Sequence, residues 1–156
     1  MAETRLLALY RKLQRWPGGA WLFSRAVCFK APYFASIAPR FTLLEAGRCE
    51  ATIPDRRAVH NHIGTVHAIA LCNLAELCGG VMTDASLPAD MRWIPKGMTV
   101  SYLKKAKGRL RGVATPEIPL VSASSGYDLP VNVDVFDADG VKVFNARILM
   151  WLSPRE

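Results

Sequence analysis

The chain has 156 residues, of which 51% are hydrophobic and 21% charged, and this is typical of one compact domain spanning residues 1–156 without disordered segments. Its 20 Lys and Arg against 13 Asp and Glu give a formal net charge of +7, which favours anionic partners such as phosphorylated small molecules, nucleic acid or an acidic carrier protein. The N-terminal residues lack the pattern of a secretory signal, and the longest apolar run, residues 66–82, is too short and too polar for a membrane span. We therefore expect a cytoplasmic protein with no membrane partner.

We expect residues 1–39 to form a helical extension that precedes the core of the domain. Apolar side chains recur at helical spacing over residues 3–16, cations occupy the other face, and Pro17-Gly18-Gly19 ends the pattern. Residues 21–29 predict a second helix, and an irregular link with prolines at both ends follows it. The two helices serve either as a lid or simply as packing, and we favour packing.

Residues 40–152 predict the core of the domain. Residues 40–46 and 48–53 have the composition of two strands joined by a glycine turn, and a histidine-rich loop follows over residues 60–64. Thr65 is the candidate N-cap of a helix that continues to residue 80 or slightly beyond. Because this helix is apolar nearly all round, we expect it to be a central helix wrapped by a sheet.

The sequence after the central helix predicts the strands of an antiparallel sheet. Residues 83–96 indicate a loop, or an extended segment from Trp93 onward. Four strands are then predicted, over residues 98–103, 109–115, 129–136 and 141–151. The predicted order of elements is helices, a hairpin, one buried helix and then antiparallel strands. This order is typical of an α+β domain in which a long helix lies across a curved sheet.

A spaced motif runs from the histidine-rich loop into the central helix. It consists of Asn61, Gly64, Thr65, His67 and Glu76, with Ala68-Ile69 directly after the last histidine. A second segment, Val100-Ser101-Tyr102-Leu103-Lys104-Lys105-Ala106, follows the helix. Both resemble the hotdog-fold thioesterase superfamily, in the branch of phenylacetate-pathway and small acyl-CoA thioesterases. There the pattern is Asn-x-x-Gly-Thr-x-His-Gly-Gly, with a carboxylate fifteen residues beyond the Asn, so that Ala68-Ile69 replace the two final glycines.

This resemblance implies a hotdog fold and hydrolysis of an acyl-CoA or acyl-carrier thioester, with no cofactor. Glu76 would then be a general base that activates water or a nucleophile that forms an anhydride with the acyl group. Asn61 either orients the loop, the water or the thioester, or is simply a turn former. Gly64 and His67 would line the substrate site, with packing alone as the alternative for His67.

The N-terminus of the predicted helix offers free backbone N–H groups to a developing oxyanion, and the N–H of Ala68 is the candidate donor. Eight residues separate Ala68 from Glu76, which is about 12 Å along a helix. One helix therefore cannot present both groups to one carbonyl. We expect a twofold homodimer in which Glu76 of one subunit faces Ala68 of the other, with pairing of two dimers into a homotetramer left open.

The basic run that follows the predicted strand at residues 98–103 has two interpretations. Lys104, Lys105 and Lys107 are either solvated surface charges or, as the resemblance implies, ligands of the phosphates of coenzyme A at the rim of a pantetheine channel.

The sequence is also compatible with other functions. A non-catalytic acyl-thioester binding protein is the main alternative, because Ala68-Ile69 replace the glycine pair. The Gly-Asp-x-Asn-Pro context of hotdog hydratases is absent, and nucleic-acid binding rests on net charge alone. His60, His62 and His67 form only a weak metal pattern, and the four cysteines lack metal-binding spacing, so we expect no metal and buried, reduced thiols.

Overall fold

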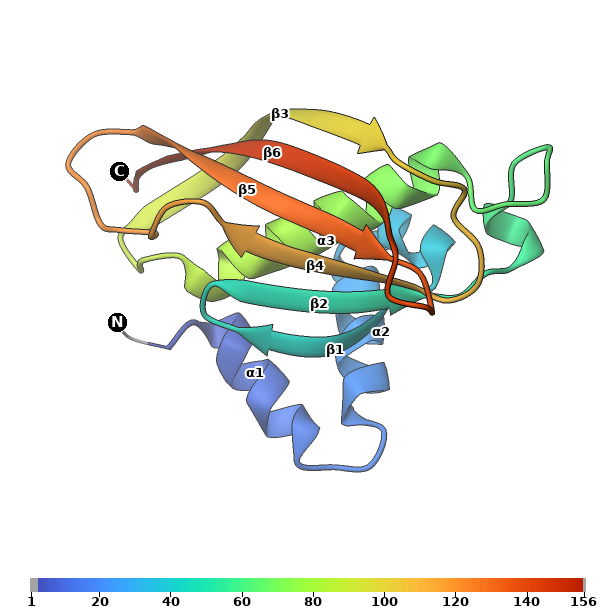
Figure 1. Cartoon of the computed structure of the whole chain (residues 1–156). Helices are drawn as coiled ribbons and strands as arrows, with labels where there is room; N and C mark the ends of the chain where they lie inside the picture. The colour runs from blue at the N-terminus through green and yellow to red at the C-terminus, as the bar shows by residue number, and fades with distance from the viewer. Residues whose placement is uncertain (1–2, 156) are drawn as a thin grey trace.

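The structure is a computed structural model that describes residues 3–155 (Figure 1). Its helices are α1 Arg5–Gln14, α2 Gly19–Lys30 and α3 Ala68–Ser86, with short 3₁₀ helices η1 Pro32–Ile37 and η2 Arg57–Val59. Its strands are β1 Arg40–Glu45, β2 Arg48–Ile53, β3 Met91–Tyr102, β4 Leu110–Pro116, β5 Tyr127–Phe136 and β6 Lys142–Pro154.

The six strands form one antiparallel sheet in the order β1-β2-β4-β5-β6-β3. The sheet curves around α3, which lies along one face, while α1 and α2 extend past the β1 edge (Figure 1). This arrangement is the hotdog fold with an N-terminal helical extension, so the predicted fold class is confirmed.

Alternating burial along the strands explains how the sheet holds α3. In β5 every second side chain from Leu129 to Val135 is buried, and the residues between them are half-buried on the outer face. The inward side chains pack on α3, whose Leu74, Leu77 and Met82 are fully buried. By length and composition α3 would also suffice to cross a membrane, but 67% of that apolar stretch is buried inside the structure, as for a core helix.

Two helix boundaries differ from those predicted. The N-cap of α3 is His67 rather than Thr65, and the helix ends at Ser86 rather than near residue 80. Thr83 and Ser86 suggested a loop because they are polar, but their hydroxyls donate to the helix carbonyls of Gly79 and Met82, at 2.8 and 2.7 Å. These bonds satisfy the hydroxyls inside the helix, so both residues are buried without breaking it.

Strand β3 is twice as long as the strand predicted over residues 98–103. It begins at Met91 and pairs with β6 along its whole length, with a register irregularity between Pro95 and Gly97. Proline is tolerated here because β3 is an edge strand, whose outer side has no partner among residues 3–155. The apolar side chains of Ile94 and Met98 are exposed along this strand.

The N-terminal helices pack on the core through aromatic contacts. Phe23 of α2 is fully buried, and its ring lies edge-on to Tyr10 of α1 at 5.0 Å and to Phe41 of β1 at 5.2 Å between ring centroids. Ser24 donates to the carbonyl of Ala20 and accepts from the N–H of Phe41 at 3.0 Å. These contacts attach the extension to the β1 side of the domain, as the packing interpretation expects.

A glycine in β4 sets how closely α3 approaches the sheet. A Cβ atom at Gly112 would lie 3.0 Å from Leu74 and 3.1 Å from the sulfur of Cys78. We expect Gly112→Ala to lower the free energy of unfolding by about 1–3 kcal/mol because the added methyl group overpacks this contact. Val113→Ile adds one methyl group to the outer face of the same strand and should change stability by less than about 0.5 kcal/mol. Equal effects in denaturant titrations would contradict the close helix–sheet contact.

Candidate functional site

Asn61 holds the loop before α3 in a tight turn. Its side-chain oxygen accepts from the backbone N–H groups of Ile63 and Thr65, at 3.1 and 3.0 Å. Its amide group donates to the hydroxyl of Thr65 at 2.8 Å. Gly64 adopts a left-handed φ of 73°, which this turn requires and which glycine accepts most readily. Asn61 and Gly64 therefore fix the path of the chain into the helix.

The first turn of α3 presents an unoccupied backbone donor. The ring Nδ1 of His67 accepts from the N–H of Ile69 at 3.0 Å, so His67 caps the helix. The N–H groups of Val66 and His67 are taken by the carbonyls of Ala106 and Val59. The N–H of Ala68 has no acceptor within residues 3–155. It lies at the positive end of the helix dipole, where an anionic atom is stabilised.

The basic run is attached to this loop. The N–H of Val66 donates to the carbonyl of Ala106 at 2.9 Å, and Asp55 accepts from the N–H of Gly108 at 2.6 Å. Asp55 also pairs with His60, and this hydrogen bond is the main cause of the lowered pKa of Asp55. The exposed side chains that the structure thereby places beside the start of α3 are those of Lys104, Lys105 and Lys107.

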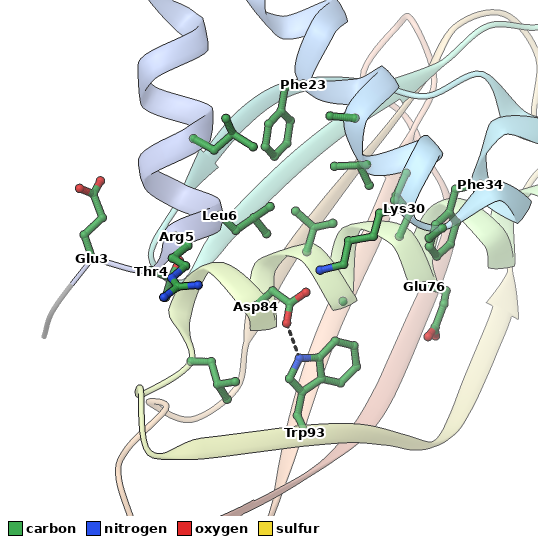
Figure 2. Close-up of a pocket in the computed structure, with 18 of the residues that line it drawn as sticks. Glu3, Thr4, Arg5, Leu6, Phe23, Lys30, Phe34, Glu76, Asp84 and Trp93 are labelled. Atoms are coloured by element: carbon green, nitrogen blue, oxygen red, sulfur yellow. Dashed lines mark hydrogen bonds between the residues drawn. The ribbon is translucent and has the colours of Figure 1, made fainter. Parts of the chain in front are cut away.

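Glu76 lies at one end of a cavity of about 1120 Å³ between α1, α2, α3 and the start of β3 (Figure 2). The carboxylate is half-buried, and no hydrogen-bond donor reaches it from the described part of the chain. Burial raises the pKa of Glu76, and no cation offsets that effect. Farther along α3, Asp84 accepts from the indole N–H of Trp93 at 2.6 Å, and Glu3 pairs with Arg11, so the other two carboxylates of the lining have partners.

The walls of this cavity are mainly apolar, with charged groups at one side. The apolar walls come from the three α-helices and from η1, and they include Leu6, Phe23, Val27, Phe34, Leu77 and Val81. Cationic groups in the lining are those of Arg5, Lys30 and Arg155. A cavity of this size and polarity suits an apolar group that carries an anionic or strongly polar end.

Asn73 is a candidate site residue that the sequence motif did not include. It is buried in α3, and its amide group donates to the hydroxyl of Ser36 at 3.1 Å, but its side-chain oxygen has no partner in residues 3–155. It lines a hollow of about 370 Å³ that also contacts His67 and Ala70. A buried acceptor without a partner lowers the stability of the fold, and a donor group of a ligand could bond to it. The only signal in the sequence was a polar residue within an apolar helix.

The structure brings most of the predicted residues together but separates them from Glu76. Asn61, Gly64, His67 and Ala68 surround the start of α3, beside the basic run. Glu76 lies two turns farther, about 12 Å along the helix. It belongs to a stripe that faces away from the core, formed by the exposed or half-buried residues Ile69, Cys72, Glu76, Gly80 and Asp84.

Two of the three histidines make contacts other than those of a metal site. His60 pairs with Asp55, and His67 caps α3. Within residues 3–155, no three His, Cys, Asp or Glu side chains are grouped so as to hold a metal ion.

Comparisons with known proteins place these features in a family context. A family model described as a domain of unknown function, DUF4442, matches residues 19–152, which include α2 but not α1. The crystal structure of the structural-genomics protein APC5556 is 47% identical with a TM-score of 0.81, over 96% of this chain and 99% of that chain. No curated protein matches the chain significantly.

Two further solved structures resemble the chain. PA5026 from Pseudomonas aeruginosa, described as a protein of unknown function and probable thioesterase, is 26% identical with a TM-score of 0.70, over 80% of this chain and 88% of that one. Thioesterase HI1161 from Haemophilus influenzae is 15% identical with a TM-score of 0.69, over 78% of this chain and 82% of that one. At that identity the second likeness concerns the fold alone. The likeness to PA5026 confirms the resemblance to hotdog-fold thioesterases.

The raised pKa of Glu76 predicts a pH-dependent stability. The folded state binds the proton more tightly than the unfolded chain, so the resulting stabilisation is present below the unfolded pKa and lost as the pH rises through the folded pKa. Glu76→Gln resembles the protonated carboxyl at every pH. It should therefore melt a few degrees above the wild type near pH 8, and this difference should vanish near pH 3.5.

Glu117→Gln is the control for this experiment. The pKa of Glu117 is lowered by its hydrogen bond to Arg147, so its replacement should not raise the melting temperature near pH 8. If the difference in melting temperature between wild type and Glu76→Gln did not change with pH, this would show that Glu76 is not desolvated.

Proposed function

Because the chain belongs to the DUF4442 family and has the hotdog fold of thioesterases, we propose that it hydrolyses the thioester of an acyl-CoA or of an acyl-carrier protein. The observation that carries this proposal is the carboxylate of Glu76, which lies half-buried in a largely apolar cavity without a hydrogen-bond donor from residues 3–155. A purely structural carboxylate at this depth would be paired with a cation or bonded by backbone donors.

In this mechanism Glu76 acts at the thioester carbon. As a general base it removes a proton from water, whose oxygen attacks the carbonyl; as a nucleophile its oxygen attacks directly and forms an anhydride that water then cleaves. In both routes the carbon–sulfur bond breaks and the thiolate leaves and takes up a proton. The raised pKa makes Glu76 a stronger base than an exposed glutamate.

The oxyanion of the tetrahedral intermediate needs a donor. In this proposal the N–H of Ala68, which has no acceptor within residues 3–155, supplies it. Asn61 acts by positioning, because its loop hydrogen bonds hold the start of α3 in place. The side-chain oxygen of Asn73 accepts from an N–H or O–H of the substrate near His67. Ala68 retains the backbone donor although its methyl group narrows the approach that glycine would leave open.

The distance between Ala68 and Glu76 leads to a twofold homodimer. Two copies of α3 that run antiparallel would bring Glu76 of one subunit to the helix start of the other. Two features support this arrangement: the partly exposed stripe of α3 that contains Glu76, and the outer edge of β3, which has no partner among residues 3–155 and exposes Ile94 and Met98. If the protein is a tetramer, it would consist of two such dimers.

The cavity beside Glu76 would hold the acyl group, and the basic run would hold the carrier. The volume and apolar walls of the cavity suit a medium-length or aromatic acyl chain. Lys104, Lys105 and Lys107 lie next to the loop that positions Ala68, where the phosphates of coenzyme A would lie outside the channel.

Hydrolysis of a panel of acyl-CoAs by the purified protein tests this proposal. We expect thiol release that falls by about a hundredfold or more in Glu76→Gln, because no other group at that position removes the proton or attacks. Asp84→Asn, on the same stripe but bonded to Trp93, should retain most of the activity. Thermal stabilisation by acyl-CoA without thiol release would instead establish the non-catalytic binding protein.

Co-expression of two variants tests the shared site. Glu76→Gln and Asn61→Ala should each be nearly inactive alone. Random assembly of the two chains should restore about a quarter of the wild-type activity, because half of the dimers are mixed and each mixed dimer has one intact site. No recovery in confirmed mixed dimers would show that both groups act within one subunit.

The basic run is tested with two thioester substrates. Lys104→Ala/Lys105→Ala should raise KM for an acyl-CoA by roughly fivefold or more and weaken its salt dependence, because two contacts to phosphate are lost. KM for the same acyl group on N-acetylcysteamine, which has no phosphate, should not change. A paired surface lysine supplies the control variant Lys142→Ala. An equal rise in KM for both substrates would show that the lysines do not bind the phosphates.

A further inference from the structure

The α1–α2 hairpin, residues 4–31, exposes large apolar side chains to solvent. Trp16 at its turn is 70% exposed, and Trp21 and Phe29 on α2 are 58% and 90% exposed. Leu22 is exposed beside them. On α2, Trp21, Arg25 and Phe29 are spaced four residues apart and share one face of the helix. Isolated exposed apolar residues are common, but two tryptophans and a phenylalanine on one short hairpin form a patch.

The same hairpin carries an unbalanced positive charge. Between Thr4 and Leu44 the sequence has seven Lys and Arg and no Asp or Glu. Within residues 3–155, Arg11 pairs with Glu3, whereas Lys12, Arg15 and Arg25 have no carboxylate partner. The segment from Arg5 to Arg40 therefore carries seven positive charges and no negative one. Lys12, Arg15 and Arg25 are exposed on the hairpin that also carries the exposed tryptophans, whereas Arg5 and Lys30 line the cavity.

The position of the hairpin leaves this patch open. The turn between α1 and α2 extends beyond β1, on the side of the sheet opposite to β3 (Figure 1). The proposed dimer contact along β3 would not cover it. Inside the hairpin, Leu7, Tyr10 and Phe23 are buried, so the exposed aromatic residues lie outside a surface that is already packed.

We propose that the α1–α2 hairpin docks the protein on the surface of an anionic lipid membrane. Tryptophan favours the boundary between headgroups and acyl chains, and lysine and arginine are attracted to anionic headgroups while their stems cover apolar surface. This occupant satisfies both the aromatic side chains and the cations. A second copy of the hairpin would bring like charges together, which opposes association. The sequence led us to expect no membrane partner because it contains no spanning segment, and surface docking requires none.

Co-sedimentation of the full-length protein with vesicles tests this proposal. We expect binding to vesicles of phosphatidylglycerol and phosphatidylcholine, little binding to phosphatidylcholine alone, and weaker binding at high salt. Arg15→Gln/Arg25→Gln should bind roughly thirtyfold more weakly, since two cations leave the anionic surface. Trp16→Ser/Trp21→Ser should also lose binding and should melt at the wild-type temperature, because both side chains are exposed.

Two control variants separate hairpin docking from general charge and exposure. Lys104→Gln/Lys105→Gln removes two cations elsewhere, and Ile118→Ser/Val121→Ser removes two exposed apolar side chains from the β4–β5 loop. Both should bind like the wild type. Equal losses in the controls, or no binding to anionic vesicles, would overturn the proposal. It would also fail if Trp16→Ser/Trp21→Ser lowered the oligomeric mass in light scattering without lipid, because the patch would then join copies of the chain.

Discussion

The packing of α3 in the curve of the sheet is the contact on which the rest of the structure depends. The helix lies so close to the strands that a single methyl group at Gly112 would meet both Leu74 and Cys78. This approach buries Leu74, Leu77 and Met82 completely, and burial of such side chains stabilises the fold by about 1.5–3 kcal/mol each. With the core side of α3 fixed, every functional group on its other faces has a fixed direction.

Glu76 shows the balance between this packing and chemistry. Its carboxylate is partly removed from water and has no donor among the described residues, so its charged form costs stability at neutral pH. Asp84, two turns farther on, shows the alternative, because the indole of Trp93 satisfies it. The fold tolerates this carboxylate, which has no donor among residues 3–155, because the burial of the rest of α3 is large. Such a locally unfavourable group is expected where binding or catalysis has shaped a site.

The sequence allowed most of the architecture to be predicted, and the errors have physical causes. Strand composition and turn residues predicted β1, β2 and β4 closely, and alternation predicted β5, because one face of each strand is buried. The end of α3 was missed because Thr83 and Ser86 bond to carbonyls of their own helix, which a count of polar residues does not reveal. The first half of β3 was missed because Pro95 and Gly97 are tolerated only at the edge of the sheet.

For the site, the spacing from Asn61 to Glu76 indicated the loop and the carboxylate. It did not indicate Asn73, whose amide group bonds to Ser36, 37 residues away, and whose side-chain oxygen has no partner within residues 3–155. Nor did helical periodicity show that Trp16, Trp21 and Phe29 stay exposed, because that depends on which face Phe23 and Tyr10 hold against the core.

The N-terminal hairpin connects the two proposals physically. Its inner residues Leu6, Phe23 and Val27 form a wall of the cavity that contains Glu76, while its outer side carries exposed tryptophans and exposed cations. A hairpin attached by packing alone can shift only by disturbing that wall. If its outer face binds anionic lipid and the cavity receives an acyl chain, then one element both recruits the protein to a source of apolar substrates and bounds the space that receives them. Arg5 and Lys30, in the lining of the same cavity, would then attract an anionic headgroup or carrier toward its entrance.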